Sequence, residues 1–564
     1  MLSPSCFWRR WVRPVLPSFI ADALLPNPND SHPVGSTRSR RPTRSTAYLD
    51  GLRGIAAMLV FIHHYTGAFP SLFLPYTLLD PPSNQTNAAA RPKHQHPLAG
   101  VVLPTHANSN TTVSSSLLPA PSIKYPKPTF LQLPFIRVLF SGRPMVHIFF
   151  VISGFALSYK TFRCLYHDHN RHKALDSLAS TTFRRAPRLL VPPIISTFFI
   201  AILQQAGLLE TPNNSVLAEL RGWSKTVFRE ITWPWAWDRD MAPGYDIHLW
   251  TIPIELAHSM MLFVVLLALA RVRYIVRNVI VGAGMGYCLA CGRWAAFEFL
   301  VGMALAETHV RREVEEEEKG LAMVEECQDE LGDVDRTGPH AAMNRVKAVN
   351  GIKTFSRRTV RLIRALGHWG MRLLQVTALV ACLFITGWPT FEESRSPIIR
   401  TLISWTPEPF ATELGDVEGP QKFWFALAAA GVVWAVGELS WVRRLFETSV
   451  AQYCGDISFA MYICHGAVSD LLGDPIMGYP TKEDGSRGRG VQGVLGMETP
   501  RQIVVGWIIG LFLLSPFVIW AADVFWRAVD RPVVNLARKF EIWCLEEERR
   551  TRTAPESEGY SVLA

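Results

Sequence analysis

Long apolar stretches alternate with polar segments along this chain. A helix that crosses a lipid bilayer needs about 20 consecutive, mostly apolar residues. Ten stretches approach that length: 49–69, 144–160, 187–206, 249–270, 274–292, 294–309, 369–388, 421–441, 452–473 and 503–522. The two weakest contain charged residues, Arg277 in one and Glu298 in the other. We therefore expect an all-α fold, a polytopic integral-membrane helix bundle with about ten transmembrane helices.

The composition agrees with a protein embedded in a membrane. Of the 564 residues, 49% are hydrophobic and only 19% are charged, against roughly 25% charged in soluble domains. The net charge of +9 would suggest a nucleic-acid partner in a soluble protein, but here the basic residues flank alternate apolar stretches. Basic residues concentrate on the cytosolic side of membrane proteins. We therefore expect both termini in the cytosol, contact with membrane lipids and no nucleic-acid partner.

The polar segments suggest how the chain is organised. We expect residues 1–47 to form a basic, largely disordered cytosolic tail, residues 48–530 to form the membrane domain, and residues 531–564 to form a cytosolic C-terminal tail. Polar insertions occupy 70–130 and 310–368 within the membrane domain. Sequons for N-glycosylation, each a weak signal alone, fall on the side predicted to be lumenal or extracellular: Asn84, Asn110 and Asn213. The endoplasmic reticulum or another endomembrane is the expected location, and the plasma membrane is the alternative.

The cysteines and loop histidines give no evidence of a metal site. The nine cysteines are scattered and imply no disulfide framework. Cys288 and Cys291 form a Cys-X-X-Cys pair inside an apolar stretch without a second pair, which favours packing over zinc binding or redox chemistry. Three histidines share a cytosolic connection, where a solvated loop is the simpler interpretation: His167, His169 and His172. We expect no bound metal ion.

Ionisable residues inside the apolar stretches are the candidates for chemistry, because such groups are energetically costly in a membrane and tend to be functional. In the first stretch Arg53 lies near the cytosolic end, and His64 follows about 16 Å deeper at about 1.5 Å per residue. His63 and His64 project about 100° apart on a helix. At most one of the two histidines is therefore expected to take part in a reaction.

Two further positions carry charge where an apolar helix begins. Arg185 and Arg188 are three residues apart and share one helix face, so their guanidinium groups could bind phosphates bidentately. The ordinary basic flank of a membrane helix is the alternative interpretation. Pro187 lies between them and is expected to bend the helix start. Glu255 stands one turn inside the fourth stretch, where a buried carboxylate needs a cation or a hydrogen-bond donor.

Six short motifs occur in an order that resembles the transmembrane acyltransferase-three family, and they extend from about residue 48 to residue 525. They are Asp50-Gly-Leu-Arg-Gly followed by His64; Phe-Phe-Val-Ile-Ser-Gly-Phe at 149–155; Arg-Arg-Ala-Pro-Arg at 184–188; Leu-Trp-Thr-Ile-Pro-Ile-Glu at 249–255; Phe-Leu-Val-Gly at 299–302; and Ser-Phe-Ala-Met-Tyr at 458–462 followed by His465. The long proline-rich insertions resemble those of filamentous-fungal members.

The resemblance implies an O-acyltransferase that moves an acyl group, usually acetyl, from acyl-CoA to a hydroxyl group. Acyl-CoA would be the donor substrate, and no tightly bound cofactor is expected. The family spacing selects His64 over His63 as the general base, and Glu255 would orient or balance the imidazolium. Three arginines at the cytosolic mouth would receive the CoA phosphates: Arg53, Arg185 and Arg188.

The sequence leaves several alternatives open. The acceptor is a small molecule such as a fungal secondary metabolite, or else a glycan or a lipid. The acyl group is transferred either directly or through an acylated side chain. A proton-coupled transporter would use the same intramembrane His, Arg and Glu residues, and a catalytically inactive membrane scaffold or receptor is a third class.

Overall fold

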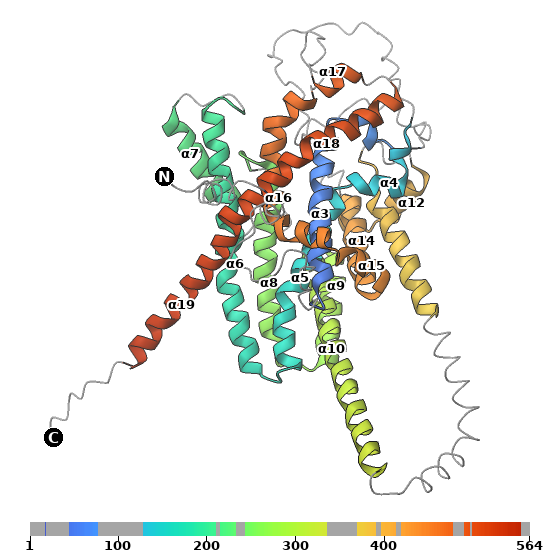
Figure 1. Ribbon diagram of the computed structural model, residues 1–564, viewed down its shortest axis with the longest axis vertical. Coiled ribbons are helices and arrows are strands. Elements are labelled where there is room, and N and C mark those ends of the chain that lie inside the picture. Colours follow the sequence, from blue (N-terminus) through green and yellow to red (C-terminus); the bar gives the residue numbers. More distant parts are fainter. Residues whose placement is uncertain are drawn as a thin grey trace, which may run out of the picture.

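The computed structural model describes Pro17 and residues 44–76, 128–209, 215–232, 243–334, 369–390, 396–412, 419–477, 490–496 and 499–553. Within these ranges the chain forms helices and turns, with no strand, and the helices assemble into an elongated bundle (Figure 1). The expected all-α fold is confirmed. Apart from Pro17, the N-terminal tail before residue 44 lies outside the described residues, as do the three sequon asparagines and residues 77–127 and 335–368 of the two insertions.

Ten long helices make up most of the bundle: α3 (Ala47–Thr66), α5 (Arg143–Tyr166), α6 (Arg171–Gln205), α8 (Thr251–Leu269), α9 (Tyr274–Ala290), α10 (Trp294–Val334), α14 (Gly419–Glu438), α16 (Ser449–Met477), α18 (Pro500–Phe525) and α19 (Arg531–Thr553). Shorter helices connect them: α4 (Pro134–Arg137), α7 (Val216–Thr226), α12 (Pro397–Ser404), α13 (Glu408–Thr412), α15 (Ser440–Phe446) and α17 (Val491–Leu495). A further helix covers Trp369–Thr386. Each of the ten predicted apolar stretches overlaps at least one helix.

Fewer helices qualify as membrane spans than the sequence suggests. By length and composition, five helices in the described ranges could cross a membrane: Arg143–Tyr166, Arg171–Gln205, Ile247–Leu269, Trp369–Thr386 and Pro500–Leu545. Helices α14 and α15 meet at 101° and would together make a sixth. The expected count of about ten is not confirmed, because α9 has only 17 residues and α3, α10 and α16 carry polar or charged side chains among apolar ones. Large apolar side chains exposed on the outer helices, such as Phe512 and Ile275, are typical of a lipid-facing surface.

Helices α3 and α16 lie side by side at the centre of the bundle and approach unusually closely. A Cβ atom on Gly54 would lie 2.2 Å from the Gly455 backbone nitrogen, and one on Gly455 would lie 2.5 Å from the Asp50 carbonyl oxygen. Only glycine permits this backbone contact. The two helices run in the same direction, because residue 53 meets residues 455 and 458 and residue 64 meets residue 465. The polar residues of both helices are thereby brought to matching depths.

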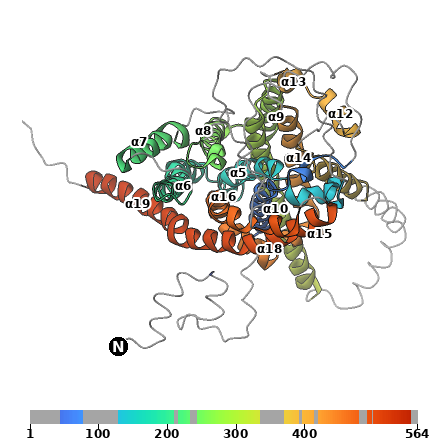
Figure 2. The ribbon, with the colours of Figure 1, turned by 90° about the horizontal axis from the view of Figure 1, so that it is seen from above.

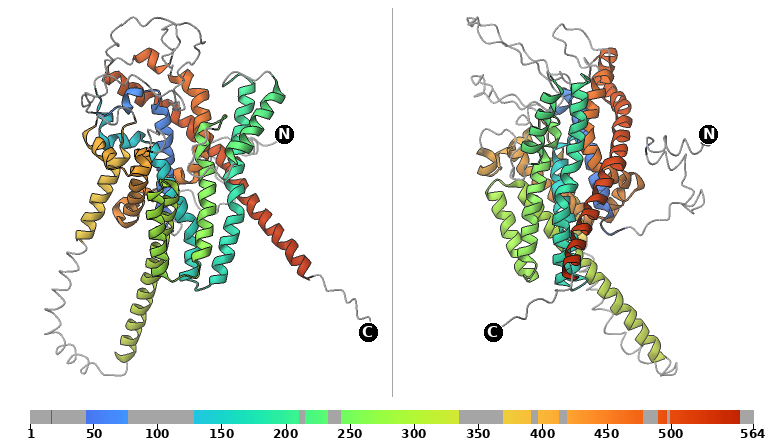
Figure 3. Two further views of the ribbon diagram at one scale, coloured as in Figure 1. Left: turned by 180° about the vertical axis from the view of Figure 1, so that it is seen from behind. Right: turned by 90° about the vertical axis from the view of Figure 1, so that its left-hand side faces the viewer.

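The C-terminal parts of α10 and α19 project from the same end of the bundle (Figure 3). Helix α10 continues to Val334, well beyond the apolar stretch predicted over 294–309, because its acidic extension is rich in Glu, which favours helix. Helix α19 runs along the edge of the bundle beside α6 (Figure 2), where Arg184 pairs with Glu541 at 3.0 Å. The sequence-predicted C-terminal tail therefore begins as a helix packed on the bundle.

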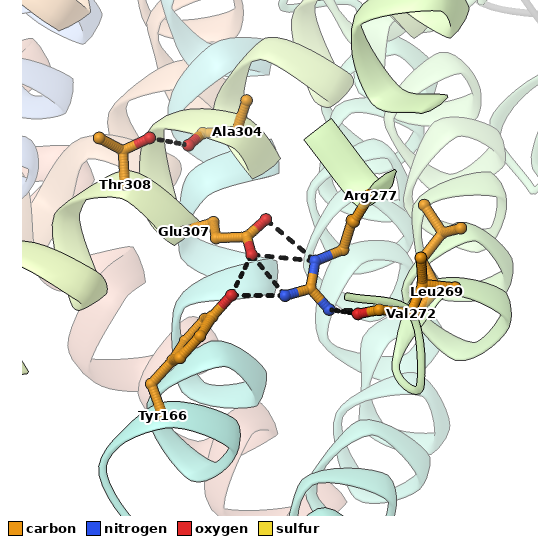
Figure 4. Close-up of polar contacts among 7 residues, drawn as sticks. All are labelled: Tyr166, Leu269, Val272, Arg277, Ala304, Glu307 and Thr308. Atoms are coloured by element: carbon orange, nitrogen blue, oxygen red, sulfur yellow. Dashed lines mark hydrogen bonds and ion pairs between the residues drawn. The ribbon is translucent and has the colours of Figure 1, made fainter. Parts of the chain in front are cut away.

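A buried ion pair accounts for the charge inside the weak apolar stretch 274–292. Arg277 on α9 donates to both carboxylate oxygens of Glu307 on α10, with Nε–oxygen distances of 2.9 and 3.1 Å (Figure 4). Its remaining nitrogens donate to the Tyr166 hydroxyl at 2.5 Å and to the Leu269 and Val272 carbonyls at 3.1 and 3.3 Å. A buried charge is tolerated when it is paired and fully hydrogen-bonded. This cluster therefore joins α5, α8, α9 and α10 structurally.

Candidate active site

The first arginine of the predicted donor site is held between α3 and α16. Arg53 donates from Nε to the Ser458 hydroxyl at 2.9 Å and from Nη2 to the Gly455 carbonyl at 3.1 Å. Asp50, one turn earlier on α3, lies 3.3 Å from Nη2. These contacts fix the guanidinium at the end of the bundle where α3 begins.

The second arginine forms an ion pair with the predicted acidic residue. Arg185 Nη2 lies 2.5 Å from Glu255 Oε1, and Arg185 Nε donates to the Ser259 hydroxyl at 3.1 Å. The Ser153 hydroxyl donates to the same carboxylate oxygen at 2.8 Å. Both members of the pair are mostly buried, with 13% and 17% of their side chains exposed. Glu255 therefore connects α5, α6 and α8 at one level of the bundle.

The third arginine has charged neighbours but no hydrogen-bond partner among the described residues. Arg188 is exposed, although charged side chains of four elements act on it electrostatically: Arg53 of α3, Arg185 of its own helix, Glu255 of α8 and Asp530 of the π-helical turn Trp526–Asp530. An accessible guanidinium in such surroundings has its donors available for an anion. The structure thus brings all three predicted arginines near one another, with Arg188 the exposed member of the three.

A cluster of three histidines occupies the deeper level. His64 on α3, His248 on the 3₁₀ helix Ile247–Trp250 and His465 on α16 approach one another closely. The ring centres of His64 and His248 are 4.2 Å apart, those of His64 and His465 are 5.1 Å apart, and those of His248 and His465 are 4.6 Å apart. One ligand atom from each ring lies within 4.8 Å of the others. These three histidines could therefore hold a metal ion, a site that the sequence did not predict.

The orientation of two of these rings is fixed by hydrogen bonds at their Nδ1 atoms. His248 Nδ1 lies 2.7 Å from Asp246 Oδ1, and His465 Nδ1 donates to the Tyr462 carbonyl at 2.8 Å. The Nε2 atoms of both rings are buried and have no hydrogen-bond partner among the described residues. Gly466 makes room for the cluster, because a Cβ atom there would lie 2.4 Å from His248 Nδ1. Both rings therefore keep Nε2 available.

The structure distinguishes the two adjacent histidines of α3. His63 is buried, and its Nδ1 atom shares a hydrogen bond of 2.9 Å with the Phe140 carbonyl. The His64 side chain has no hydrogen bond with any described residue and lies against the other two histidine rings of the cluster. The preference for His64 as the reactive histidine agrees with this arrangement, and its catalytic role stays a prediction.

The expected position of Glu255 beside His64 is not what the structure shows. The carboxylate of Glu255 is bound by Arg185 and Ser153, and Glu255 follows His248 by seven residues, about 10 Å along a helix. Within the part of the chain that the structure describes, the carboxylate hydrogen-bonded to the histidine cluster is that of Asp246. The sequence did not single out Asp246, because it precedes the apolar stretch. His248 and His465 lie in or next to the motifs, but no role was predicted for them.

Comparison with known proteins agrees with the family that the motifs resemble. A family model described as an acyltransferase domain matches residues 99–313. O-acetyltransferase PaAT-1 of Phomopsis amygdali is 26% identical over 556 residues, which cover 92% of this chain and 88% of that protein. The acyltransferase clz18 of Cochliobolus lunatus is 25% identical over 524 residues, covering 86% and 94%. A Phoma acyltransferase is 24% identical over 526 residues, covering 87% and 95%.

No solved structure matches the chain significantly. The three sequence relatives match 86–92% of this chain. The family model and the three fungal relatives together show that this chain is a transferase enzyme, and its sequence is similar to those of fungal acyltransferases.

Proposed function

We propose that this enzyme is an integral-membrane O-acyltransferase that moves an acyl group, acetyl by analogy with its relative PaAT-1, from acyl-CoA to a hydroxyl group. The observation that carries the proposal is the position of His64. Its side chain has no hydrogen-bond partner among the described residues and lies in a cluster of three histidines. Arg53 stands eleven residues before it on the same helix, about 16 Å away. A long substrate could therefore contact the arginines and the histidine cluster at the same time.

The chemistry requires a base. A hydroxyl group has a pKa far above 7, and a histidine is the side chain best suited to accept its proton near neutral pH. His64 accepts that proton while the hydroxyl oxygen attacks the thioester carbonyl. The carbon–sulfur bond then breaks, and the CoA thiolate takes the proton from His64. His248, with the Asp246 carboxylate on its Nδ1 atom, stabilises the positive charge that the cluster carries in between.

In this proposal the three arginines, Arg53, Arg185 and Arg188, form the donor site. Arg188 is exposed and its guanidinium has no hydrogen-bond partner among the described residues, and Arg53 and Arg185 are held near it. Guanidinium groups bind phosphate oxygens bidentately. The pantetheine arm of CoA is long and narrow, so phosphates bound at Arg188 leave the thioester free to reach His64. Glu255 then acts by holding Arg185 in place.

The orientation follows from the same arrangement. The three arginines lie at the end of the bundle where α3 begins, and this end is proposed to face the cytosol, from which CoA would enter, with both termini on the same side. An endomembrane such as the endoplasmic reticulum is the proposed location. For the acceptor we propose a small molecule, in particular a fungal secondary metabolite. A glycan or lipid acceptor is the alternative class.

Two measurements test this function. Purified enzyme in detergent should release CoA from acetyl-CoA at a rate that rises when a suitable hydroxyl-bearing acceptor is added, as followed with a thiol reagent. Comparison of extracts from a deletion strain and its parent should show one acylated metabolite replaced by its free hydroxyl form. If the extracts are identical and no tested acyl-CoA is consumed, the proposed activity is wrong.

A further inference from the structure

The histidine cluster has the construction of a metal site, which the proposed transfer reaction does not require. We propose that His64, His248 and His465 bind one Zn²⁺ ion, and that zinc binding and acyl transfer exclude each other. The exclusion rests on the proposed function, since it assumes that His64 is the base. The zinc site itself rests only on the geometry of the three rings.

The spacing of the rings fits three ligands of one tetrahedral ion. With zinc–nitrogen distances of about 2.0–2.1 Å, three imidazole ring centres around a tetrahedral ion lie about 5 Å apart, and the ligand nitrogens about 3.3 Å apart. The observed ring centres are 4.2, 4.6 and 5.1 Å apart. The ligand atoms all lie within 4.8 Å of one another, so side-chain rotations that move them by about 1 Å complete the site.

The contacts behind the rings are those that metal-bound histidines make. A ligating histidine usually donates its other ring N–H to a carboxylate or a backbone carbonyl, which fixes the tautomer and raises the basicity of the ligand. His248 does this with Asp246 and His465 with the Tyr462 carbonyl. The Nε2 atoms of these two rings are buried without a partner among the described residues, and at most 8% of either residue is exposed. These two lone pairs are therefore preorganised for a cation.

The ion is best described as zinc. Three neutral imidazoles suit Zn²⁺ and other late first-row ions, and three histidines with one open position form a common zinc arrangement. The Asp246 carboxylate behind His248 offsets one of the two charges. The lone pair that His64 would use to accept a proton is the same lone pair that would bind zinc. An occupied site therefore has no free base, and its fourth coordination position lies where the acceptor hydroxyl has to enter.

Zinc binding can be measured without any acyl transfer. Purified full-length protein is stripped with a chelator, incubated with ZnCl₂, desalted and analysed for zinc by mass spectrometry. We expect one zinc more per chain in the native protein than in His465→Gln, and an affinity about 10–100-fold weaker in Asp246→Asn. The difference from His465→Gln is the informative quantity, because the exposed His167 and His172 could add zinc in all samples. His63→Gln, a neighbour outside the cluster, serves as the matched control and should bind like the native protein.

Acyl-transfer assays test whether zinc binding and acyl transfer exclude each other. Stoichiometric zinc should abolish CoA release from acetyl-CoA in the native protein and in His63→Gln, and a chelator should restore it. Equal zinc content in native protein and in a folded, monodisperse His465→Gln variant would overturn the site. Transfer that continues at full zinc occupancy, or that the chelator abolishes, would overturn the exclusion. If the metal-free protein shows no transfer at all, the proposed function fails, and the zinc analysis still decides whether the site exists.

Discussion

The substitution Asp246→Asn removes the negative charge that, among the described residues, is hydrogen-bonded to the histidine cluster. The carboxylate lies 2.7 Å from His248 Nδ1, and the His248 ring centre lies 4.2 Å from that of His64. Asparagine keeps the size of the side chain, and its amide oxygen can still accept the hydrogen bond from Nδ1. The variant therefore tests charge with little change in geometry.

The size of the effect follows from Coulomb's law. Two unit charges about 4 Å apart interact by about 4 kcal/mol at an effective dielectric constant of about 20. If the cluster holds the proton of the acceptor hydroxyl in the transition state, most of that stabilisation is lost in Asp246→Asn. Because about 1.4 kcal/mol corresponds to a tenfold change in rate, we expect kcat to fall about 100- to 1,000-fold. The KM for acyl-CoA should change little, since the donor site is one level away.

Glu255→Gln is the matched control, because it removes a carboxylate that the structure assigns to Arg185 instead. At about 10 Å from the cluster the same law gives less than half the interaction energy. We expect this variant mainly to raise the KM for acyl-CoA, because Arg185 loses its partner, with at most about a tenfold fall in kcat. Initial rates of CoA release over a range of acyl-CoA concentrations, at saturating acceptor, separate the two parameters. A larger loss of kcat in Glu255→Gln than in Asp246→Asn would refute the reasoning. Glu255, and not Asp246, would then be the acid that stabilises the protonated histidine cluster.

Two further predictions concern the donor site and the buried ion pair. Arg188→Gln should raise the KM for acyl-CoA about tenfold or more and leave kcat nearly unchanged, because Arg188 offers unused donors to a phosphate; steady-state kinetics with an unchanged KM would contradict the assigned donor site. Glu307→Leu should destabilise the solubilised protein by about 3–5 kcal/mol, because Arg277 stays buried without its counter-ion, and adding Arg277→Met should recover most of the loss. Thermal denaturation in detergent reports both effects. A native midpoint in Glu307→Leu would contradict a stabilising role of the pair, and equal midpoints for the single and double variants would contradict unpaired Arg277 as the cause of the loss.

The apolar pattern predicted the helices well because the period and length of an apolar segment are local properties. All ten predicted stretches overlap helices, and the charge at Arg277, which weakened one of them, is satisfied by Glu307 across the bundle. The number of membrane spans was harder to predict. A helix with polar side chains, such as α3 or α16, falls below the hydropathy of a lipid-facing span even when it lies at the centre of the bundle.

Candidate residues were also easier to find than their partners. An arginine or histidine in an apolar stretch is visible in the sequence, and the structure brings Arg53, Arg185 and Arg188 together as expected. The partner of Glu255 could not be inferred, because whether its carboxylate meets Arg185 or His64 depends on where α8 stands relative to α3 and α6. The three-histidine cluster depends in the same way on contacts between distant segments, through the close approach of Gly54 and Gly455.

The central claim is that His64, within its cluster, accepts the proton of the acceptor hydroxyl. The most direct measurement is the rate of acyl transfer by His64→Gln compared with His63→Gln, with both variants shown to be folded by size-exclusion chromatography. Removal of a general base typically lowers the rate about 10²–10⁴-fold, so His64→Gln should lose activity to that extent, while His63→Gln should transfer acyl groups within a few-fold of the native rate. Full activity in His64→Gln, or an equal loss in both variants, would contradict the account.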